Sequence, residues 1–154
     1  MNLSKHFTLE EMTKSEVAER RGIPNVPGEQ SVANLKVLCE RILEPVRDNF
    51  GVPFSPNSGY RSPELNEVLG SSPNSQHCKG EAADIEIPTV SNDLLAWWIR
   101  TSLDFDQLIL EYYTVGDPSS GWVHVSYKGD GRSARNRREV LTYSGSGYTR
   151  GLPE

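Results

Sequence analysis

The pattern of apolar and polar positions predicts helices concentrated early in the chain and strands later. Between Ser31 and Phe50, apolar residues recur at steps of three and four, which is the spacing of one buried helix face. Pro45 lies inside this pattern and removes a backbone donor, so we expect the helix to kink or break there. Alternating apolar and polar residues predict one strand over residues 121–126 and another that Asp84 opens.

Residues that favour helix N-termini mark four shorter helices. Thr8 is followed three residues later by Glu11, the pattern of a capping box. A fourth helix, from Ser91 to about Thr101, has an apolar face that we assign to Leu94, Leu95, Trp98 and Ile99. The four expected helices begin at Thr8, Ser15, Ser62 and Ser91.

Three further segments have the composition of strands. Residues 52–58 contain prolines and suit an edge strand. Residues 105–113 alternate in polarity, and the turn at 116–121 predicts that they form a hairpin with the strand over 121–126. Residues 139–143 make a last strand, whereas the glycine-rich tail 145–154 is expected to be loosely held.

These elements predict a single α+β domain over residues 1–154, built on a mainly antiparallel sheet with helices packed on one side. Residues 1–30 would form its N-terminal helical segment. A chain of 154 residues is long enough for one domain with its own core.

Composition excludes some classes of partner. The formal charge of -5 and the pI near 5.3 argue against nucleic-acid binding, which requires a concentrated positive surface. The basic run 128–138 is interpreted as a solvated loop, with contact to an anionic polymer as the alternative. Neither a signal peptide nor a membrane span is expected, because no basic stretch precedes an apolar run.

The two cysteines predict no disulfide framework. Cys39 lies within an apolar helical pattern and is expected to fill the core. Cys78 follows His77 directly, and adjacent residues rarely both reach one ion, so we do not count Cys78 among the candidate ligands.

Candidate metal ligands occur in the stretch from Ser75 to Asp84. His77 and Asp84 lie seven residues apart, and a catalytic zinc site needs three protein ligands of this kind. If the strands that contain Asp84 and His124 share one sheet, these two side chains can share its polar face. His6, the remaining histidine, belongs to no ligand pattern and is expected at the surface. Either of the other histidines could instead be a hydrogen-bonded structural residue.

Three blocks of sequence together resemble a known family. They are Ser58-Gly59-Tyr60-Arg61-Ser62, the pattern His-x-x-Gly-x-Ala-x-Asp from His77 to Asp84, and Trp122-Val123-His124-Val125. Their order resembles the zinc peptidases of the D-alanyl-D-alanine carboxypeptidase family, M15. The segments 6–12 and 43–47 are similar to its phage and bacterial branch. This resemblance implies a zinc ion held by His77, Asp84 and His124, on the sheet face and the adjoining loop.

The resemblance also implies a substrate. It indicates a peptidase that acts on peptidoglycan stem peptides, either trimming a terminal D-alanine or cutting inside the peptide. Arg61 would grip a substrate carboxyl or carbonyl group, and we also expect Tyr60 and Gln76 to contact substrate. The alternative is a metal-containing module that binds the cell wall without cutting it.

The general base is not fixed by the motif. Many family members have an acidic residue three positions before the last histidine, where this chain has Gly121. A carboxylate is still needed to take a proton from the attacking water. Glu111 is the first candidate because its strand is expected to pair with that of His124. Asp117 and Glu86 are alternatives, and Glu111 could instead be an exposed salt-bridge partner.

The expected partners and location follow from the same resemblance. We expect a monomer that binds peptidoglycan peptides and neither nucleic acid nor membrane. Because the cell wall lies outside the membrane, a phage enzyme would require release by a separate pore-forming protein or delivery in a virion.

Overall fold

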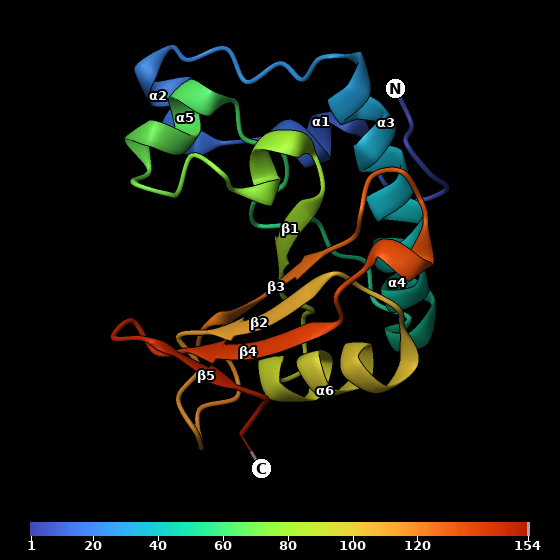
Figure 1. Ribbon diagram of the computed structural model, residues 1–154, viewed down its shortest axis with the longest axis vertical. Coiled ribbons are helices and arrows are strands. Elements are labelled where there is room, and N and C mark those ends of the chain that lie inside the picture. The colour runs from blue at the N-terminus through green and yellow to red at the C-terminus, as the bar shows by residue number, and fades with distance from the viewer. Residues whose placement is uncertain (154) are drawn as a thin grey trace.

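Five strands form one sheet in this computed structural model (Figure 1). The structure describes residues 1–153. The strand order is β1-β3-β2-β4-β5, and all neighbours are antiparallel except β2 and β4. The prediction of an α+β fold with a mainly antiparallel sheet is therefore confirmed. The strands are β1 (Ala82–Ile85), β2 (Gln107–Glu111), β3 (Trp122–Ser126), β4 (Glu139–Tyr143) and β5 (Tyr148–Arg150).

The predicted caps begin the helices of the structure. Thr8 makes both bonds of its capping box, and the side chains of Ser15 and Ser62 each accept a backbone hydrogen bond. Ser91 occupies the N-cap position without a side-chain bond. The α-helices are α1 (Leu9–Thr13), α2 (Glu16–Arg21), α3 (Glu29–Leu38), α4 (Glu44–Phe50), α5 (Pro63–Val68) and α6 (Asn92–Ser102), and the short helices are η1 (Cys39–Leu43), η2 (Gln76–Lys79) and η3 (Ser133–Arg135).

The predicted irregularity at Pro45 is a π turn. The segment η1 separates α3 from α4, and Pro45 lies in the first turn of α4. Proline has no N–H and its ring crowds the preceding turn, so regular α-helical bonding cannot continue through it. The π turn widens the backbone there, with the Glu44 N–H donating to the Cys39 carbonyl.

The sheet has one apolar face and one polar face, as the alternation predicted. Leu108 and Leu110 of β2 and Val123 and Val125 of β3 are fully buried in the core. The residues that alternate with them along the strands, including Glu111 and His124, line a cleft on the other face. Side chains from α3, η1, α4 and α6 complete the core against the apolar face.

Two strand predictions need correction. Residues 52–58 form no strand, and only Ser58 bridges to Asp84. Pro53 and Pro56 have no N–H to donate, which explains why a continuous ladder does not form. The strand that Asp84 was expected to open begins at Ala82 instead, because Ala82 and Ala83 pair with β3 as well.

The predictions for the side chains of Leu94 and His6 also differ from the structure. Leu94, assigned to the apolar face of α6, is 55% exposed. Trp98 packs against Phe50, whereas Trp97 faces solvent. His6 is partly buried, and its Nδ1 lies 2.6 Å from the Glu44 carboxylate, so it links the N-terminus to α4.

The C-terminal tail is more ordered than expected. Residues 148–150 form β5, which pairs with β4. The basic run 128–138 is a loop with one short helix, as predicted. Several of its arginines are paired, and Arg137 binds the buried carboxylate of Asp106.

The predictions for the two cysteines agree with the structure. Cys39 is buried in the core and Cys78 is half-buried, and both thiols are free. Within residues 1–153, no helix is both long and apolar enough to cross a membrane.

The central position of β2 gives a test of the core. Leu108→Ala should lower the free energy of unfolding by about 2–5 kcal/mol, because it leaves a cavity in a closely packed interior. Leu94→Ala makes the same chemical change at an exposed position and should change the free energy by less than about 0.5 kcal/mol. Equilibrium denaturation measures both, and equal effects would contradict this description of the core.

Candidate active site

Three buried side chains converge at the polar face of the sheet. Asp84 of β1 and His124 of β3 are cross-strand partners, and His77 approaches from η2. The Asp84 Oδ1 atom lies 3.1 Å from His124 Nδ1 and 3.4 Å from His77 Nε2. One candidate ligand atom from each of the three residues lies within 4.8 Å of the others. The structure therefore brings together the three residues that the sequence motif selected.

Local packing explains the spacing of the motif. Ser75 caps η2 by accepting a bond from the His77 N–H, and Gly80 ends η2 with a left-handed φ of 75°. A Cβ atom on Gly80 would crowd the Ser31 carbonyl and the Leu35 side chain of α3. Only glycine combines this backbone conformation with this close approach, so Gly80 fixes the path from His77 to β1.

A backbone carbonyl orients His77. Its Nδ1 lies 2.7 Å from the Gly59 carbonyl oxygen, which can only accept a hydrogen bond. Nδ1 therefore carries a proton, which leaves Nε2, the nitrogen that faces Asp84, as the candidate metal ligand. This is the arrangement that metal-binding histidines use, with the second ring nitrogen held by an outer partner.

The protonation states also suit metal binding. Burial lowers the pKa of His77, which favours the neutral imidazole despite the neighbouring Asp84. Burial alone would raise the pKa of Asp84, but His77 and His124 outweigh it and hold that pKa well below its usual value. A neutral imidazole and an ionised carboxylate are the forms that coordinate a metal. Two imidazoles and one carboxylate thus fit a metal ion, and Cys78 is not part of the cluster.

The cluster opens into a cleft of about 700 Å³. Arg61 and the loop 69–77 form one side of the cleft, and the polar face of the sheet forms its floor. Aromatic side chains from β3, β4 and β5 also line it. Among the described residues that line the cleft, the carboxylates are those of Asp84 and Glu111.

Glu111 has the position and environment expected of a base. It is the last residue of β2 and pairs across the ladder with Trp122, two residues before His124. Burial raises the pKa of Glu111, and the negative charge of Asp84 raises it further. The Trp122 indole N–H is buried beside it without a hydrogen-bond partner among residues 1–153.

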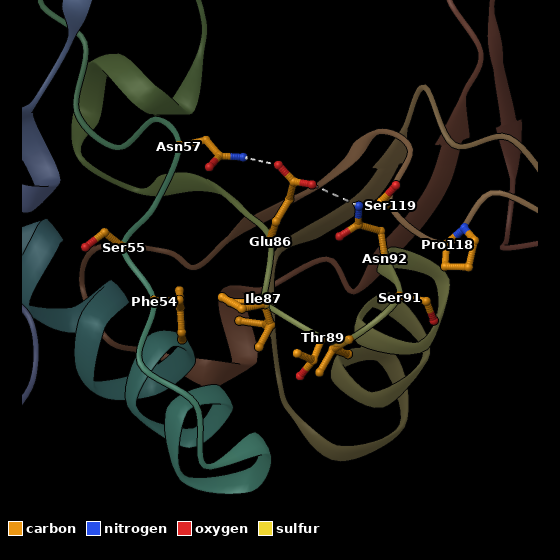
Figure 2. A pocket seen from close by; sticks show the side chains of 12 residues that line it. Phe54, Ser55, Asn57, Glu86, Ile87, Thr89, Ser91, Asn92, Pro118 and Ser119 are labelled. Atoms are coloured by element: carbon orange, nitrogen blue, oxygen red, sulfur yellow. Dashed lines mark hydrogen bonds between the residues drawn. The ribbon is translucent and has the colours of Figure 1, made fainter.

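The two alternative bases lie elsewhere. Glu86 accepts hydrogen bonds from Asn57 at 2.8 Å and Asn92 at 3.3 Å, and Figure 2 shows it in a separate pocket of about 570 Å³. Asp117 lies in the exposed turn between β2 and β3 and lines neither pocket. Neither side chain borders the cleft, which leaves Glu111 as the candidate that does.

Gly121 explains why the acidic residue is missing from its usual position. It has a left-handed φ of 68°, which disfavours any residue with a side chain. A Cβ atom there would overlap the backbone oxygen of Glu111. The close approach of β2 at this point excludes a carboxylate from position 121, and the same strand brings Glu111 into the cleft.

Arg61 is held in place by three side chains. Its Nη2 lies 3.3 Å from Asp84 Oδ2, Nε donates to Ser58 Oγ at 3.0 Å, and Nη1 donates to Ser71 Oγ at 3.2 Å. The side chain is 14% exposed and lines the cleft. Ser71 could not be identified from the sequence, because it lies in a loop that contains several serines.

Gln76 and Tyr60, the other two residues predicted to contact substrate, lie in different places. Gln76 lines the cleft and donates its amide N–H to Asp106 at 2.9 Å, which leaves its carbonyl oxygen as an acceptor. Tyr60 is 7% exposed, packs in the core and does not line the cleft. Tyr60 instead lines a neighbouring pocket together with Arg61, and its contact with substrate stays a prediction.

Asp106 has a structural role that was not predicted from the sequence. Its side chain is fully buried and accepts bonds from Gln76 and from the Nε and Nη2 atoms of Arg137. Burial alone would raise the pKa of Asp106, but the Arg137 hydrogen bonds outweigh it and lower that pKa. The sequence places this aspartate between Phe105 and an apolar strand, where an unpaired charge is costly, and this position could have indicated a buried ion pair.

A family model described as Peptidase M15 matches residues 5–126 of the chain. The match covers more than half of the sequence, so the chain belongs to this family and is a peptidase. A search of curated proteins found no match. The family match ends at the last residue of β3, so β4 and β5 lie beyond it.

The close approach at Gly121 can be tested on stability. Gly121→Ala should destabilise the fold by more than Gly116→Ala, because both glycines have positive φ but nothing lies within 4 Å of a Cβ at Gly116. The control should lose about 1–2 kcal/mol, the usual cost of a left-handed alanine. Equal losses in denaturation experiments would show that the contact between residues 121 and 111 is unimportant.

Proposed function

We propose that this member of the peptidase M15 family is a zinc-dependent hydrolase of peptidoglycan stem peptides. The observation that carries the proposal is the convergence of His77, Asp84 and His124 in an open cleft that also contains Glu111 and Arg61. The bond cut is either the terminal D-alanine bond or one inside the peptide.

The donor set favours zinc. His77, Asp84 and His124 would supply two imidazole nitrogens and a carboxylate oxygen, which is a three-ligand set used by catalytic zinc. A zinc ion bound there would supply Lewis-acid polarisation of the scissile carbonyl and activation of a water molecule. The protonation states of His77 and Asp84 require no change before metal binding.

Glu111 is the proposed general base. Its carboxylate would accept the proton that the attacking water loses and would return it to the leaving amine. Its pKa is raised by burial, which makes the carboxylate a stronger proton acceptor than an exposed glutamate. A binding module without activity would need no general base and would be consistent with a glycine at position 121, but Glu111 supplies a carboxylate to the cleft.

Arg61 and Gln76 are the proposed substrate-binding residues. The Arg61 guanidinium is directed by Ser58, Ser71 and Asp84 and offers planar donors to a substrate carboxyl or carbonyl oxygen. Gln76, with its amide N–H engaged by Asp106, would accept a hydrogen bond from a substrate N–H. A donor at Arg61 and an acceptor at Gln76 match the carbonyl and N–H groups of a peptide backbone.

The proposed partner is the peptide portion of peptidoglycan, cleaved by a monomer without nucleic acid or membrane as partner. If the chain is phage-encoded, it would reach the wall from the host cytoplasm through a separate pore-forming protein or in a virion.

Metal content provides the first test of this function. The purified protein should bind about one zinc ion per chain, and Asp84→Asn should lose most of it because a ligand charge is removed. Glu86→Gln is the matched control, since Glu86 lies two residues away and faces another pocket. Elemental analysis measures both variants. Wild-type zinc content in Asp84→Asn would rule out the proposed ligand set.

Digestion of purified peptidoglycan, followed by mass spectrometry of the products, tests the activity and identifies the bond. Glu111→Gln should retain zinc and lose about a hundredfold or more in turnover, the scale expected for a general base. Asp117→Asn should behave like the wild type, because Asp117 lies outside the cleft. No cleavage by the zinc-loaded wild type would instead support the binding module.

A further inference from the structure

Four aromatic side chains form a row along one side of the cleft. Trp122 packs against Tyr112 with ring centroids 5.1 Å apart, Tyr112 meets Tyr143 at 5.4 Å, and Tyr143 meets Tyr148 at 4.5 Å. All four line the cleft that contains the histidine cluster. Trp122, Tyr143 and Tyr148 belong to β3, β4 and β5, and Tyr112 follows β2, so the row crosses the sheet from strand to strand.

The row is open to solvent. Tyr148 is 59% exposed and Tyr112 is 47% exposed, so two neighbouring parts of the row present large rings to solvent. Tyr112 also has a left-handed φ of 54°, an uncommon conformation for a bulky residue. A Cβ atom on Gly145 would come within 3.0 Å of the Tyr112 ring, so the glycine makes room for it. The fold thus holds an exposed ring in a strained backbone conformation beside a cleft.

Half of the row comes from sequence beyond the family match. Tyr143 and Tyr148 follow residue 126, where the match ends. The histidine cluster, Glu111 and Arg61 all lie within it. The row therefore combines residues from inside and outside the region that the family model matches.

We infer that this aromatic row is a saccharide-binding subsite, which takes the glycan end of a peptide still attached to its sugar. The inference rests on the proposed function, because it places the scissile peptide bond at the histidine cluster and the sugar along the row. Aromatic faces pack against the C–H faces of sugar rings, and tyrosine adds a hydroxyl that can bond to a sugar hydroxyl.

The surroundings of the row favour a sugar over an apolar peptide side chain. An apolar side chain is best held in an enclosed pocket, whereas Tyr112 and Tyr148 leave a ligand partly hydrated. Gln107 also lines the cleft, and because its amide N–H donates to Glu139, its side-chain oxygen is left to accept a hydrogen bond from a hydroxyl group. A saccharide has both the apolar ring face and the polar edge that this surface complements.

A purely structural role would be to hold β5 against β4, since Tyr143 and Tyr148 are cross-strand partners. That role alone does not explain Tyr112, which lies outside the two strands and is nearly half exposed. A stabilising cluster gains from burial, and the outer rings of this row remain in solvent.

Binding of N-acetylglucosamine tetramer to the full chain, measured by calorimetry, tests the subsite without requiring catalysis. The wild type should bind, and Tyr148→Ser should weaken the binding roughly three- to tenfold, the scale of one aromatic contact. Tyr148→Phe keeps the ring and should retain most of the affinity. Trp97→Ser is the matched control, because Trp97 is 55% exposed on α6 and lies outside the cleft. It should bind like the wild type.

Because Tyr148→Ser could release β5, Tyr112→Asn provides a second variant whose side chain tolerates a positive φ. It should weaken tetramer binding by a similar factor. Absence of wild-type binding would overturn the inference, and so would binding that neither Tyr148→Ser nor Tyr112→Asn weakens. A loss in Trp97→Ser as large as in Tyr148→Ser would also overturn it.

A kinetic comparison separates this inference from the proposed function. Stem peptides still linked to glycan should be cleaved with a higher kcat/KM than the same peptides freed from glycan, and Tyr148→Ser should narrow that ratio. If the wild type and Tyr148→Ser cleave both substrates with the same ratio of kcat/KM values, the saccharide subsite is wrong and the peptidase function stands. Failure to cleave either substrate, with tetramer binding retained, would overturn the peptidase function and support the sugar site.

Discussion

The buried carboxylate of Asp84 is the group on which the site depends. An ionised carboxylate at 7% exposure is costly unless opposite charges and hydrogen-bond donors surround it. The Arg61 guanidinium and His124 Nδ1 meet that requirement from segments distant in the sequence, and His77 Nε2 lies 3.4 Å from the same carboxylate. The backbone of Asp84 also bonds to Ser58, which anchors the segment that carries Arg61. Each part of the site is therefore tied to one residue of β1, and a bound cation would add to the same set of interactions.

The sheet determines which residues can join Asp84. Its alternation turns Leu108 and Leu110 into the core and leaves Glu111 on the face that Asp84 and His124 share. The contact between Gly121 and the backbone of Glu111 then excludes a side chain at position 121. The close approach of the two strands thus explains why position 121 has no acidic side chain, and the carboxylate in the cleft comes from Glu111 on the neighbouring strand.

The sequence predicted the features that follow from local pattern. Helix caps, the irregularity at Pro45 and the two faces of β2 all depend on neighbours within a few residues. The motif also selected the three residues that the sheet brings together. Residues 52–58 were assigned wrongly because their apolar character resembles a strand, whereas their prolines prevent the ladder. Leu94 was assigned wrongly because helical periodicity does not tell how wide the covered face is.

The features that the sequence did not reveal depend on contacts between distant segments. Asp106 is separated by 30 positions from Gln76 and by 31 from Arg137, yet its carboxylate holds both at the edge of the cleft. The aromatic row has the same character, because its two halves, Trp122 with Tyr112 and Tyr143 with Tyr148, join only when β4 pairs in parallel with β2. That parallel pairing is the one departure from an antiparallel sheet, and it places Tyr143 beside Tyr112. The order of strands, which no local pattern encodes, therefore determines the shape of the cleft beyond the metal-binding motif.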